Sequence, residues 1–190
     1  MAPAIPPPTV CIVQAEARYS VPANLIRSVL HAEGAGPGVA AHNHNGSEDL
    51  GWMQINTLWL TKLAPYGITR NVLLHDACIN VGVGAWILQR YYLRFHDWTS
   101  AIRAYNVGPH LSGGYDYARR VITRWRGLAL AAANNIDEAP GGQGMAFIAT
   151  ATQAVTDEAP IHEEVDFIAS TTPTTSITPG VTDETETSSE

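Results

Sequence analysis

The stretch PANLIRSVLHAEG, residues 22–34, decides how the first part of this chain folds. Pro22 suits the first turn of a helix, where its missing amide hydrogen is not needed, and Gly34 suits the position just after a helix end. Four residues follow the i, i+3, i+4, i+7 spacing of one helical face: Ile26, Val29, Leu30 and Glu33. The stretch therefore predicts an amphipathic helix over residues 22–33 with one carboxylate on its apolar face.

Glu33 is an unusual residue for such a position. Burying a carboxylate is costly, and the C-terminal end of a helix disfavours an anion. Both effects raise the pKa of the carboxyl group, and a raised pKa is what a general acid for a glycosidic oxygen needs. A Glu that simply reaches solvent from a helix end is the plain alternative, so Glu33 by itself is only a candidate acid.

Other segments predict further helices around this one. The expected elements are a helix over residues 12–19, an irregular loop or small β-hairpin over 34–50, and helices over 57–63, 76–94, 97–105 and 115–125. Asp76 and Asp97 (or Thr99) are suited to cap two of these helices. The pattern predicts an α+β fold, mostly α, with a small β-hairpin beside the helix that carries Glu33.

Charge divides the chain into two unlike parts. Residues 1–126 hold all 11 Lys and Arg, all five Trp and all seven Tyr, whereas residues 127–190 hold 11 acids and no Lys or Arg. Only the first part has the composition to build a core. We therefore expect a Pro-rich lead over residues 1–10, a folded domain over 11–128 and an acidic, low-complexity, disordered tail over 129–190.

Several functional classes are not supported by the sequence. The Arg residues are scattered without interleaved aromatic clusters, so no nucleic-acid interface is predicted. No apolar run reaches the roughly 18 residues of a membrane span, and the Pro-rich lead has no basic segment typical of a secretory signal. His42 and His44 lie in a polar loop without a third ligand in sight, so neither a metal nor a cofactor is expected.

Two short segments are rich in groups that can bind sugars. GWMQIN, residues 51–56, places the amides Gln54 and Asn56 among apolar residues, and AYNVG, residues 104–108, ends a helix with Tyr105 and Asn106. Each of these side chains taken alone is more often a structural polar group. Amides, a phenol and nearby indoles are nevertheless the groups that bind saccharides by hydrogen bonds and ring stacking.

Four blocks of sequence together resemble the family 1 lytic transglycosylases, in particular the small enzymes attached to secretion and conjugation systems. The blocks are HAEG around Glu33, NGSEDLGWMQIN, DACINVGVGAWIL and AYNVG, and the resemblance runs from about Cys11 to Gly108. It implies a lysozyme-like fold. The sequence departs from the family where Gly34 follows the acid in place of a usual serine, and where Trp52 replaces a usual leucine.

The resemblance also implies roles for individual residues. Glu33 matches the sole catalytic acid/base, and Tyr105 matches a tyrosine that hydrogen-bonds its carboxylate. The substrate-binding residues would be Met53, Gln54, Asn56, Tyr105 and Asn106. Cys11 and Cys78, which from spacing alone could be free buried thiols or a disulfide, match a bonded pair.

The implied activity is cleavage of the β-1,4 bond between N-acetylmuramic acid and N-acetylglucosamine in peptidoglycan, with formation of 1,6-anhydro ends. The implied partners are glycan strands and, through the acidic tail, secretion or conjugation proteins. The protein is expected to be an exported or periplasmic monomer. Two alternatives stay open. A hydrolytic goose-type-like lysozyme would need a second carboxylate, for which Asp49 is the nearest candidate although its place indicates bracing of the hairpin. A secretion-system subunit that binds peptidoglycan is the other.

Overall fold

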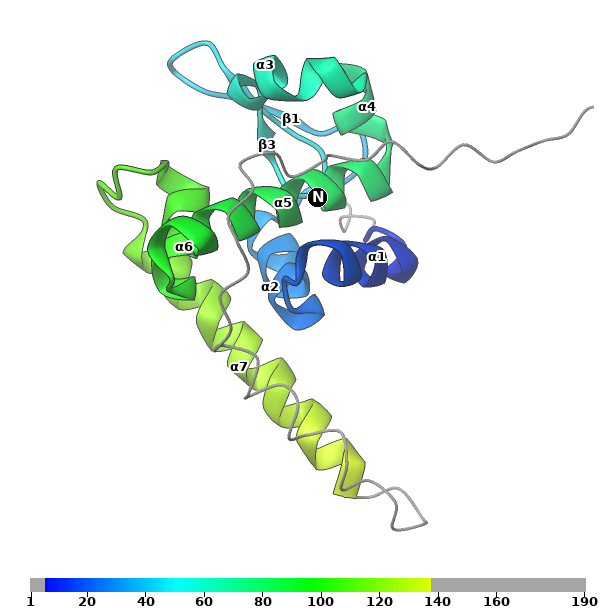
Figure 1. Ribbon diagram of the computed structural model, residues 1–190, viewed down its shortest axis with the longest axis vertical. Helices are drawn as coiled ribbons and strands as arrows, with labels where there is room; N and C mark the ends of the chain where they lie inside the picture. Colours follow the sequence, from blue (N-terminus) through cyan, green and yellow to red (C-terminus); the bar gives the residue numbers. More distant parts are fainter. Residues whose placement is uncertain (1–5, 138–190) are drawn as a thin grey trace, which may run out of the picture. The chain divides into compact units, whose positions relative to one another are not determined.

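The computed structural model describes residues 6–137 of the chain (Figure 1). Its elements, in chain order, are α1 (Thr9–Tyr19), α2 (Ala23–Glu33), β1 (Ala40–His42), β2 (Glu48–Leu50), β3 (Ile55–Asn56), the 3-10 turn η1 (Thr57–Trp59), α3 (Leu60–Leu63), the 3-10 turn η2 (Ala64–Tyr66), α4 (Arg70–His75), α5 (Ala77–Phe95), α6 (Trp98–Val107) and α7 (Tyr115–Asp137). The predicted class, α+β and mostly α, is confirmed.

Helix α5 is the central element of this domain (Figure 1). It packs against α1 on one side and α6 on another, while α2 packs against α7. Its middle is buried without interruption from Asn80 to Leu88, which explains why its sequence has little polar periodicity. Its N-terminus begins at Asp76, whose side chain accepts a hydrogen bond from the Ile79 amide at 2.9 Å, as predicted.

Helix α2 has the predicted shape and position. Leu25, Ile26 and Val29 are fully buried on its inner face, and Gly34 ends the helix in the left-handed conformation with φ of 63°. A glycine is favoured there because a Cβ would strain that backbone. The helix therefore delivers Glu33, its last residue, to the end of the apolar face.

The predicted β-hairpin is a three-stranded antiparallel sheet in the order β1-β2-β3. Residues Ala40 and Leu50 are partners in the first pair, and Asp49 faces Asn56 in the second. The third strand was not predicted because its two residues, Ile55 and Asn56, are too few to show an alternating pattern. This strand joins the GWMQIN segment to the hairpin.

A disulfide joins Cys11 of α1 to Cys78 of α5, as the resemblance implied. It closes a separation of 67 residues in sequence. Because α1 precedes α2 and α5 is the central helix, the bond ties the start of the domain to its core. Among the described residues no free cysteine remains.

The last helix differs from the prediction at its C-terminal end. Helix α7 continues past Trp125 through Asp137, so residues 129–137 are helical and the predicted start of the tail at residue 129 is wrong. The added residues are mostly Ala and Leu, which favour helix through their intrinsic propensity. The remainder of the predicted tail, residues 138–190, and the start of the predicted lead, residues 1–5, lie outside the described residues.

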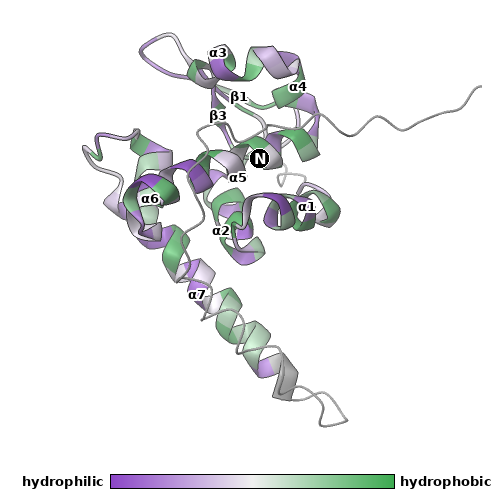
Figure 2. Ribbon diagram, in the orientation of Figure 1, coloured by the Kyte–Doolittle hydropathy of each residue, from purple (hydrophilic) through white to green (hydrophobic). Residues whose placement is uncertain are grey.

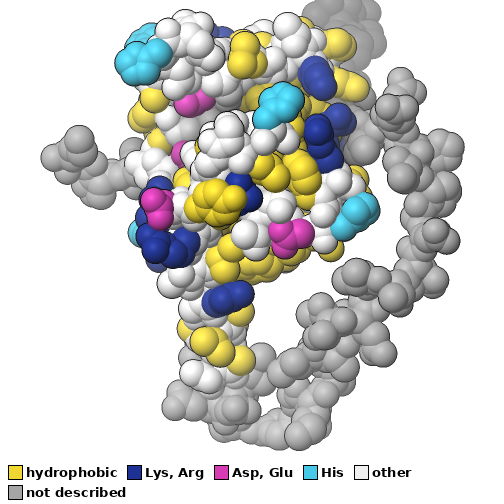
Figure 3. All heavy atoms as spheres, turned by 90° about the vertical axis from the view of Figure 1, so that its left-hand side faces the viewer, with side chains coloured by type: hydrophobic (Ala, Val, Ile, Leu, Met, Phe, Trp, Pro, Cys, Tyr) yellow, Lys and Arg dark blue, Asp and Glu magenta, His cyan; other side chains and the backbone are white. Residues whose placement is uncertain are grey.

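The surface is polar but not uniformly charged. Apolar and polar residues mix along the exposed helices, including α7 (Figure 2). On the face in Figure 3 the Lys and Arg side chains stand in separate groups beside apolar surface, which matches their scatter in sequence. Within residues 6–137, no helix combines the length and the apolar character that crossing a membrane requires.

Candidate active site

A cleft of about 690 Å³ opens beside the C-terminal end of α2. Its lining residues come from several parts of the fold: Glu33 from α2; Asn43, His44, Asn45, Ser47, Asp49, Gln54, Ile55 and Asn56 from the sheet and its loops; Leu58, Trp59 and Lys62 from η1 and α3; Ile87 and Tyr91 from α5; and residues 104–109 from the end of α6. The cleft thus brings together residues from all four sequence blocks described above. The DACINVGVGAWIL block contributes Ile87 of α5.

Glu33 is a half-buried carboxyl group in this cleft. Burial raises its pKa to about 7, and the negative charge of Asp49 adds to that increase. A hydrogen bond from Tyr117 and the charge of Arg120 act in the opposite direction. A carboxyl group with a pKa near 7 holds a proton over much of the neutral range, as a general acid must.

The residue that hydrogen-bonds Glu33 is Tyr117, which was not predicted from the sequence. The Tyr117 hydroxyl donates a 2.5 Å hydrogen bond to Oε1 of Glu33. Tyr117 lies in the first turn of α7 and its side chain is buried. Burial and the neighbouring negative charge of Glu33 raise the pKa of Tyr117, so the phenol keeps its proton and remains a donor.

The expected bond from Tyr105 to Glu33 is therefore wrong. The Tyr105 hydroxyl donates instead to the carbonyl oxygen of Met53 at 2.7 Å. Tyr105 does line the cleft, and the charge of Glu33 contributes to the raised pKa of its phenol after the larger effect of burial. Two tyrosines thus lie near the acid, and only Tyr117 is hydrogen-bonded to it.

The loop that contains Met53 is fixed by a buried asparagine of α5. Asn80 is fully buried; its amide donates to the carbonyl oxygens of Leu50 and Leu73, each at 2.9 Å, and accepts from the Met53 amide at 2.8 Å. A Cβ on Gly51 would lie 2.4 Å from the Leu73 oxygen. The close approach of loop and helix therefore requires glycine at position 51.

Met53 does not line the cleft, contrary to expectation. Its side chain is fully buried and lies so close to Gly84 of α5 that a Cβ there would be 2.4 Å from the Met53 sulfur. The side chain points to the core because the Met53 amide is held by Asn80 on the α5 side. Met53 contributes to the site only through its backbone carbonyl, which receives the Tyr105 hydroxyl.

The three other predicted substrate residues do line the cleft: Gln54, Asn56 and Asn106. Gln54 has a positive φ of 49°, and its side-chain amide donates to the Gly51 carbonyl at 2.8 Å. Asn56 caps η1 by accepting from the Leu58 amide. Asn106 is exposed at the end of α6. These placements agree with a role in binding substrate, which stays a prediction.

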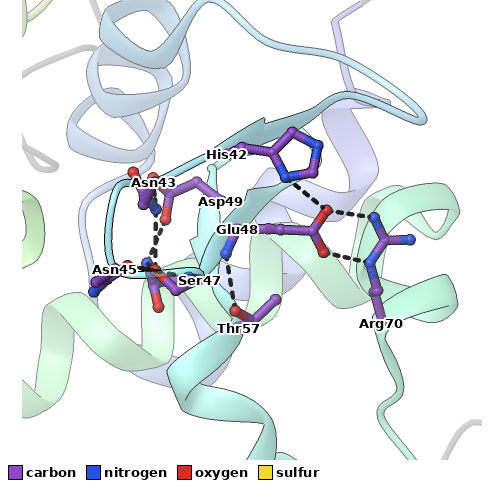
Figure 4. Close-up of polar contacts among 9 residues, drawn as sticks. His42, Asn43, Asn45, Ser47, Glu48, Asp49, Thr57 and Arg70 are labelled. Atoms are coloured by element: carbon purple, nitrogen blue, oxygen red, sulfur yellow. Dashed lines mark hydrogen bonds and ion pairs between the residues drawn. The ribbon is translucent and has the colours of Figure 1, made fainter.

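Asp49 is a second carboxylate in the cleft, and a network of amides holds it (Figure 4). Its Oδ1 accepts from the Asn56 amide at 2.7 Å and its Oδ2 from the Asn43 amide at 3.0 Å. Ser47 lies between the two asparagines and receives a hydrogen bond from each. The predicted bracing role of Asp49 is confirmed, because the carboxylate connects the β1–β2 turn to β3.

A separate ion pair joins β2, the middle strand of the sheet, to α4. Glu48 receives two hydrogen bonds from Arg70 at the start of α4, at 2.6 and 2.8 Å, and His42 Nδ1 lies 3.4 Å from the same carboxylate (Figure 4). The Glu48 amide donates to the Thr57 hydroxyl at 3.0 Å. These contacts attach the sheet to its flanking turns. Within the described part of the chain, no three His, Cys, Asp or Glu side chains are grouped as metal ligands.

Arg103 positions the segment that brings Tyr117 to the cleft. From α6 its guanidinium donates to the carbonyl oxygens of Gly113 at 2.9 Å and Leu111 at 2.8 Å, and it lies 3.6 Å over the Tyr115 ring. The loop between α6 and α7 is thereby held against α6. The first turn of α7, which contains Tyr117, follows directly from that loop.

The fold and the site together define a lysozyme-like domain. A helix end carries one half-buried acid at a polar cleft, with a three-stranded sheet on one side and helices on the other. Residues 10–116 match the model of the transglycosylase SLT domain, and this chain belongs to that family. Members of the family are lytic transglycosylases.

Curated proteins from two bacterial genera resemble the chain. It is 39% identical over 122 residues to invasion protein IagB of Salmonella typhimurium, an alignment that covers 62% of this chain and 76% of IagB. The same identity and coverage hold for IagB of Salmonella typhi. The chain is 30% identical over 99 residues to protein IpgF of Shigella flexneri, which covers 52% of this chain and 65% of IpgF.

Proposed function

We propose that this protein cleaves the β-1,4 bond between N-acetylmuramic acid and N-acetylglucosamine in peptidoglycan, with Glu33 as the single acid and base. The observation that carries the proposal is the environment of Glu33: a half-buried carboxyl group, with pKa raised to about 7, hydrogen-bonded to Tyr117 in a cleft lined by amides and aromatic rings. The family of the chain supports the same chemistry.

The proposed reaction has two proton transfers at one carboxyl group. Protonated Glu33 gives its proton to the glycosidic oxygen as the bond to the muramic acid C1 breaks. The acetamido group of that sugar stabilises the positive charge that develops at C1. Glu33, now ionised, takes the proton of the sugar's own C6 hydroxyl as its oxygen attacks C1. The products are a new N-acetylglucosamine end and a 1,6-anhydro-muramic end.

Asp49 makes hydrolysis the second candidate. A hydrolase would need a second carboxylate to activate water, and Asp49 is the other carboxylate among the described residues that line the cleft. Both of its oxygens, however, already accept amide hydrogens from Asn43 and Asn56. We therefore assign Asp49 a structural role, in which its charge also helps to keep Glu33 protonated.

The products formed from purified sacculi distinguish the two candidates. The proposal expects anhydro-muropeptides from the wild-type protein and at least about 100-fold less from Glu33→Gln, whereas hydrolysis would give reducing muramic ends. Asp49→Asn is the companion variant. Asn43 and Asn56 each donate a hydrogen bond to one oxygen of Asp49, so an asparagine at position 49 would place its own NH2 group against one of these two donors. The variant should lose stability while the products of its residual activity stay anhydro.

We further propose that the protein acts outside the cytoplasm, as a monomer, and opens the cell wall locally for a secretion or conjugation apparatus. The Cys11–Cys78 disulfide supports an oxidising compartment. The name of the Salmonella relative, an invasion protein, and the branch that the sequence resembles support a link to such an apparatus. Co-purification of the full chain with secretion components from the producing cells tests this role, and a protein that never associates with them would contradict it.

A further inference from the structure

Lys62 is the one lysine of the chain, and it lies in the cleft with the proposed acid. It belongs to α3, on the wall that η1 and α3 form. The acidic side chains among the described lining residues are Glu33 and Asp49. The ammonium group therefore gives one part of an otherwise acidic cleft a positive charge.

The Lys62 ammonium is free to bind an anion. Within residues 6–137, no carboxylate lies within ion-pair distance of it, and the side chain is exposed. By contrast, Arg70 is paired with Glu48 and Arg119 with Asp116. The interaction that the structure gives Lys62 is a cation–π contact with the Trp59 ring.

Trp59 is the aromatic neighbour of the lysine, and its ring is itself packed against other rings. The ammonium nitrogen lies 5.6 Å from the centre of the Trp59 ring, within the range of a cation–π contact. Trp59 packs edge-on against Trp86 at 5.4 Å and Tyr91 at 6.3 Å, so its ring is fixed by two others. Trp59 and Tyr91 also line the cleft. Trp59 and Tyr91, whose rings stand edge-on to each other at 73°, thus form an aromatic corner of the cleft, with the Lys62 ammonium beside Trp59.

An aromatic corner with a cation beside it suits a particular part of a sugar polymer. Aromatic faces stack on the apolar faces of sugar rings, and a neighbouring ammonium group favours an anionic substituent. N-acetylmuramic acid carries such a substituent: a lactyl carboxylate when it is unsubstituted, or a peptide with free carboxylates when it is substituted. N-acetylglucosamine carries no charge.

We propose that Lys62 is a specificity-determining residue that binds a carboxylate of the muramic side chain or of its peptide, while Trp59 and Tyr91 support the sugar. This inference rests on the proposed action on peptidoglycan. It adds that the enzyme distinguishes muramic acid from neutral sugars, and that it does so in part by charge. Because the ion pair forms in an exposed part of the cleft, its contribution is a modest one.

Kinetics on three soluble glycan substrates test the proposal. The substrates are peptide-bearing strands, strands stripped by an amidase so that the lactyl carboxylate is free, and strands whose carboxyl groups are converted to neutral amides. The variants are Lys62→Met, which keeps the stem without the charge, and Lys62→Arg, which keeps the charge. Arg124→Gln, an exposed cation of α7 outside the cleft, is the control.

We expect Lys62→Met to raise KM about three- to fivefold on carboxylate-bearing strands at low salt, with kcat unchanged. The difference should shrink in high salt and vanish on amidated strands. Lys62→Arg should stay within twofold of wild type, as should Arg124→Gln. If the KM of Lys62→Met also rises on stripped strands, Lys62 binds the lactyl carboxylate. If the rise is confined to peptide-bearing strands, Lys62 binds a carboxylate of the peptide.

Equal KM values for wild type and Lys62→Met on every substrate would overturn the inference while leaving glycan cleavage intact. An equal rise on amidated strands would also overturn it, because it would show lost packing on Trp59 instead of lost charge. If the wild-type protein releases no product at all, the proposed function fails separately. Sedimentation of Glu33→Gln and of Glu33→Gln with Lys62→Met on intact and amidated sacculi then still decides whether Lys62 binds a carboxylate.

Discussion

The Tyr117 hydroxyl donates a 2.5 Å hydrogen bond to Oε1 of Glu33, across 84 residues of sequence. This bond joins the first turn of α7 to the last residue of α2, and those two helices pack against each other. It fixes one oxygen of the carboxyl group, so the other is the one that can face a glycosidic oxygen. It also favours the ionised form of Glu33 against the effect of burial.

Tyr117→Phe should therefore change the pH dependence of activity. Removal of the donor raises the pKa of Glu33 further above 7, so the acid stays protonated to higher pH and the alkaline limb of the kcat/KM profile moves upward. The rate at the optimum should fall at least several-fold, because the carboxyl group is less well oriented and is a weaker acid in the first step. Rates on soluble glycan strands from pH 4 to 9 measure both effects. An unshifted limb would mean that the bond does not act on the acid.

Tyr105→Phe is the matched variant, and it should act on stability instead. It leaves the Met53 carbonyl without the hydroxyl that donates to it, which should lower the free energy of unfolding by about 1–3 kcal/mol. The alkaline limb should stay where it is in the wild type, since Tyr105 is not bonded to Glu33. Urea unfolding together with the same pH profile tests this. A limb shift as large as that of Tyr117→Phe would show that both tyrosines tune the acid.

Asn80→Ala should be among the most damaging substitutions away from the acid. It removes a buried side chain that makes hydrogen bonds with Leu50, Leu73 and Met53 at once. Leaving those backbone groups unpaired should cost about 3 kcal/mol or more. Asn106→Ala, at an exposed amide of the cleft, is the control and should change stability by less than about 0.5 kcal/mol. Comparable stability of the two variants would contradict the role given to Asn80.

Glu33→Gln should stabilise the protein at alkaline pH. The pKa of Glu33 rises from 4.5 to about 7 on folding, so between these values the folded state binds more protons and its stability falls as pH increases. The amide carries no such penalty and can still accept from Tyr117. We expect the variant to be more stable than wild type by about 1–3 kcal/mol at pH 8, with the difference lost below pH 4.5. Asp116→Asn, which changes the exposed ion pair with Arg119, is the control and should show no such pH-dependent increase in stability. An equal increase in this variant would contradict the assignment of the effect to Glu33.

Part of this site could be predicted from the sequence because it depends on local patterns. The helix of Glu33 is defined by the spacing of Ile26 and Val29 and by Gly34 after its end, and these features act within a few turns. The caps Asp76 and Asp97 were predictable for the same reason, since a capping side chain bonds amides two or three residues away.

The contacts between distant segments could not be predicted in this way. Tyr105 belongs to α6 and Tyr117 to α7. Which of the two reaches Glu33 depends on the path of the loop between these helices, which Arg103 holds in place. That path is a property of tertiary packing, not of spacing. One signal was present: Asn80 is an amide inside an otherwise apolar helix segment, and such a residue needs partners.

The extent of α7 was missed for a different reason. The fall in aromatic and basic residues after Trp125 predicts the end of a core, but it does not predict where the helix ends. Leu128, Leu130 and the alanines after them still favour helix, so the backbone remains helical to Asp137 although the side chains of residues 129–134 are exposed. Composition predicts burial better than it predicts local conformation.

The most direct test is the analysis of muropeptides released from purified sacculi at pH 6 by the wild-type protein and by Glu33→Gln. The wild type should release muropeptides with 1,6-anhydro-muramic ends, and Glu33→Gln, folded as judged by its circular dichroism, should release at least about 100-fold less. Reducing muramic ends from the wild type, or anhydro products from Glu33→Gln at a rate within a few-fold of wild type, would contradict the assignment of Glu33 as the single acid and base of a lytic transglycosylase.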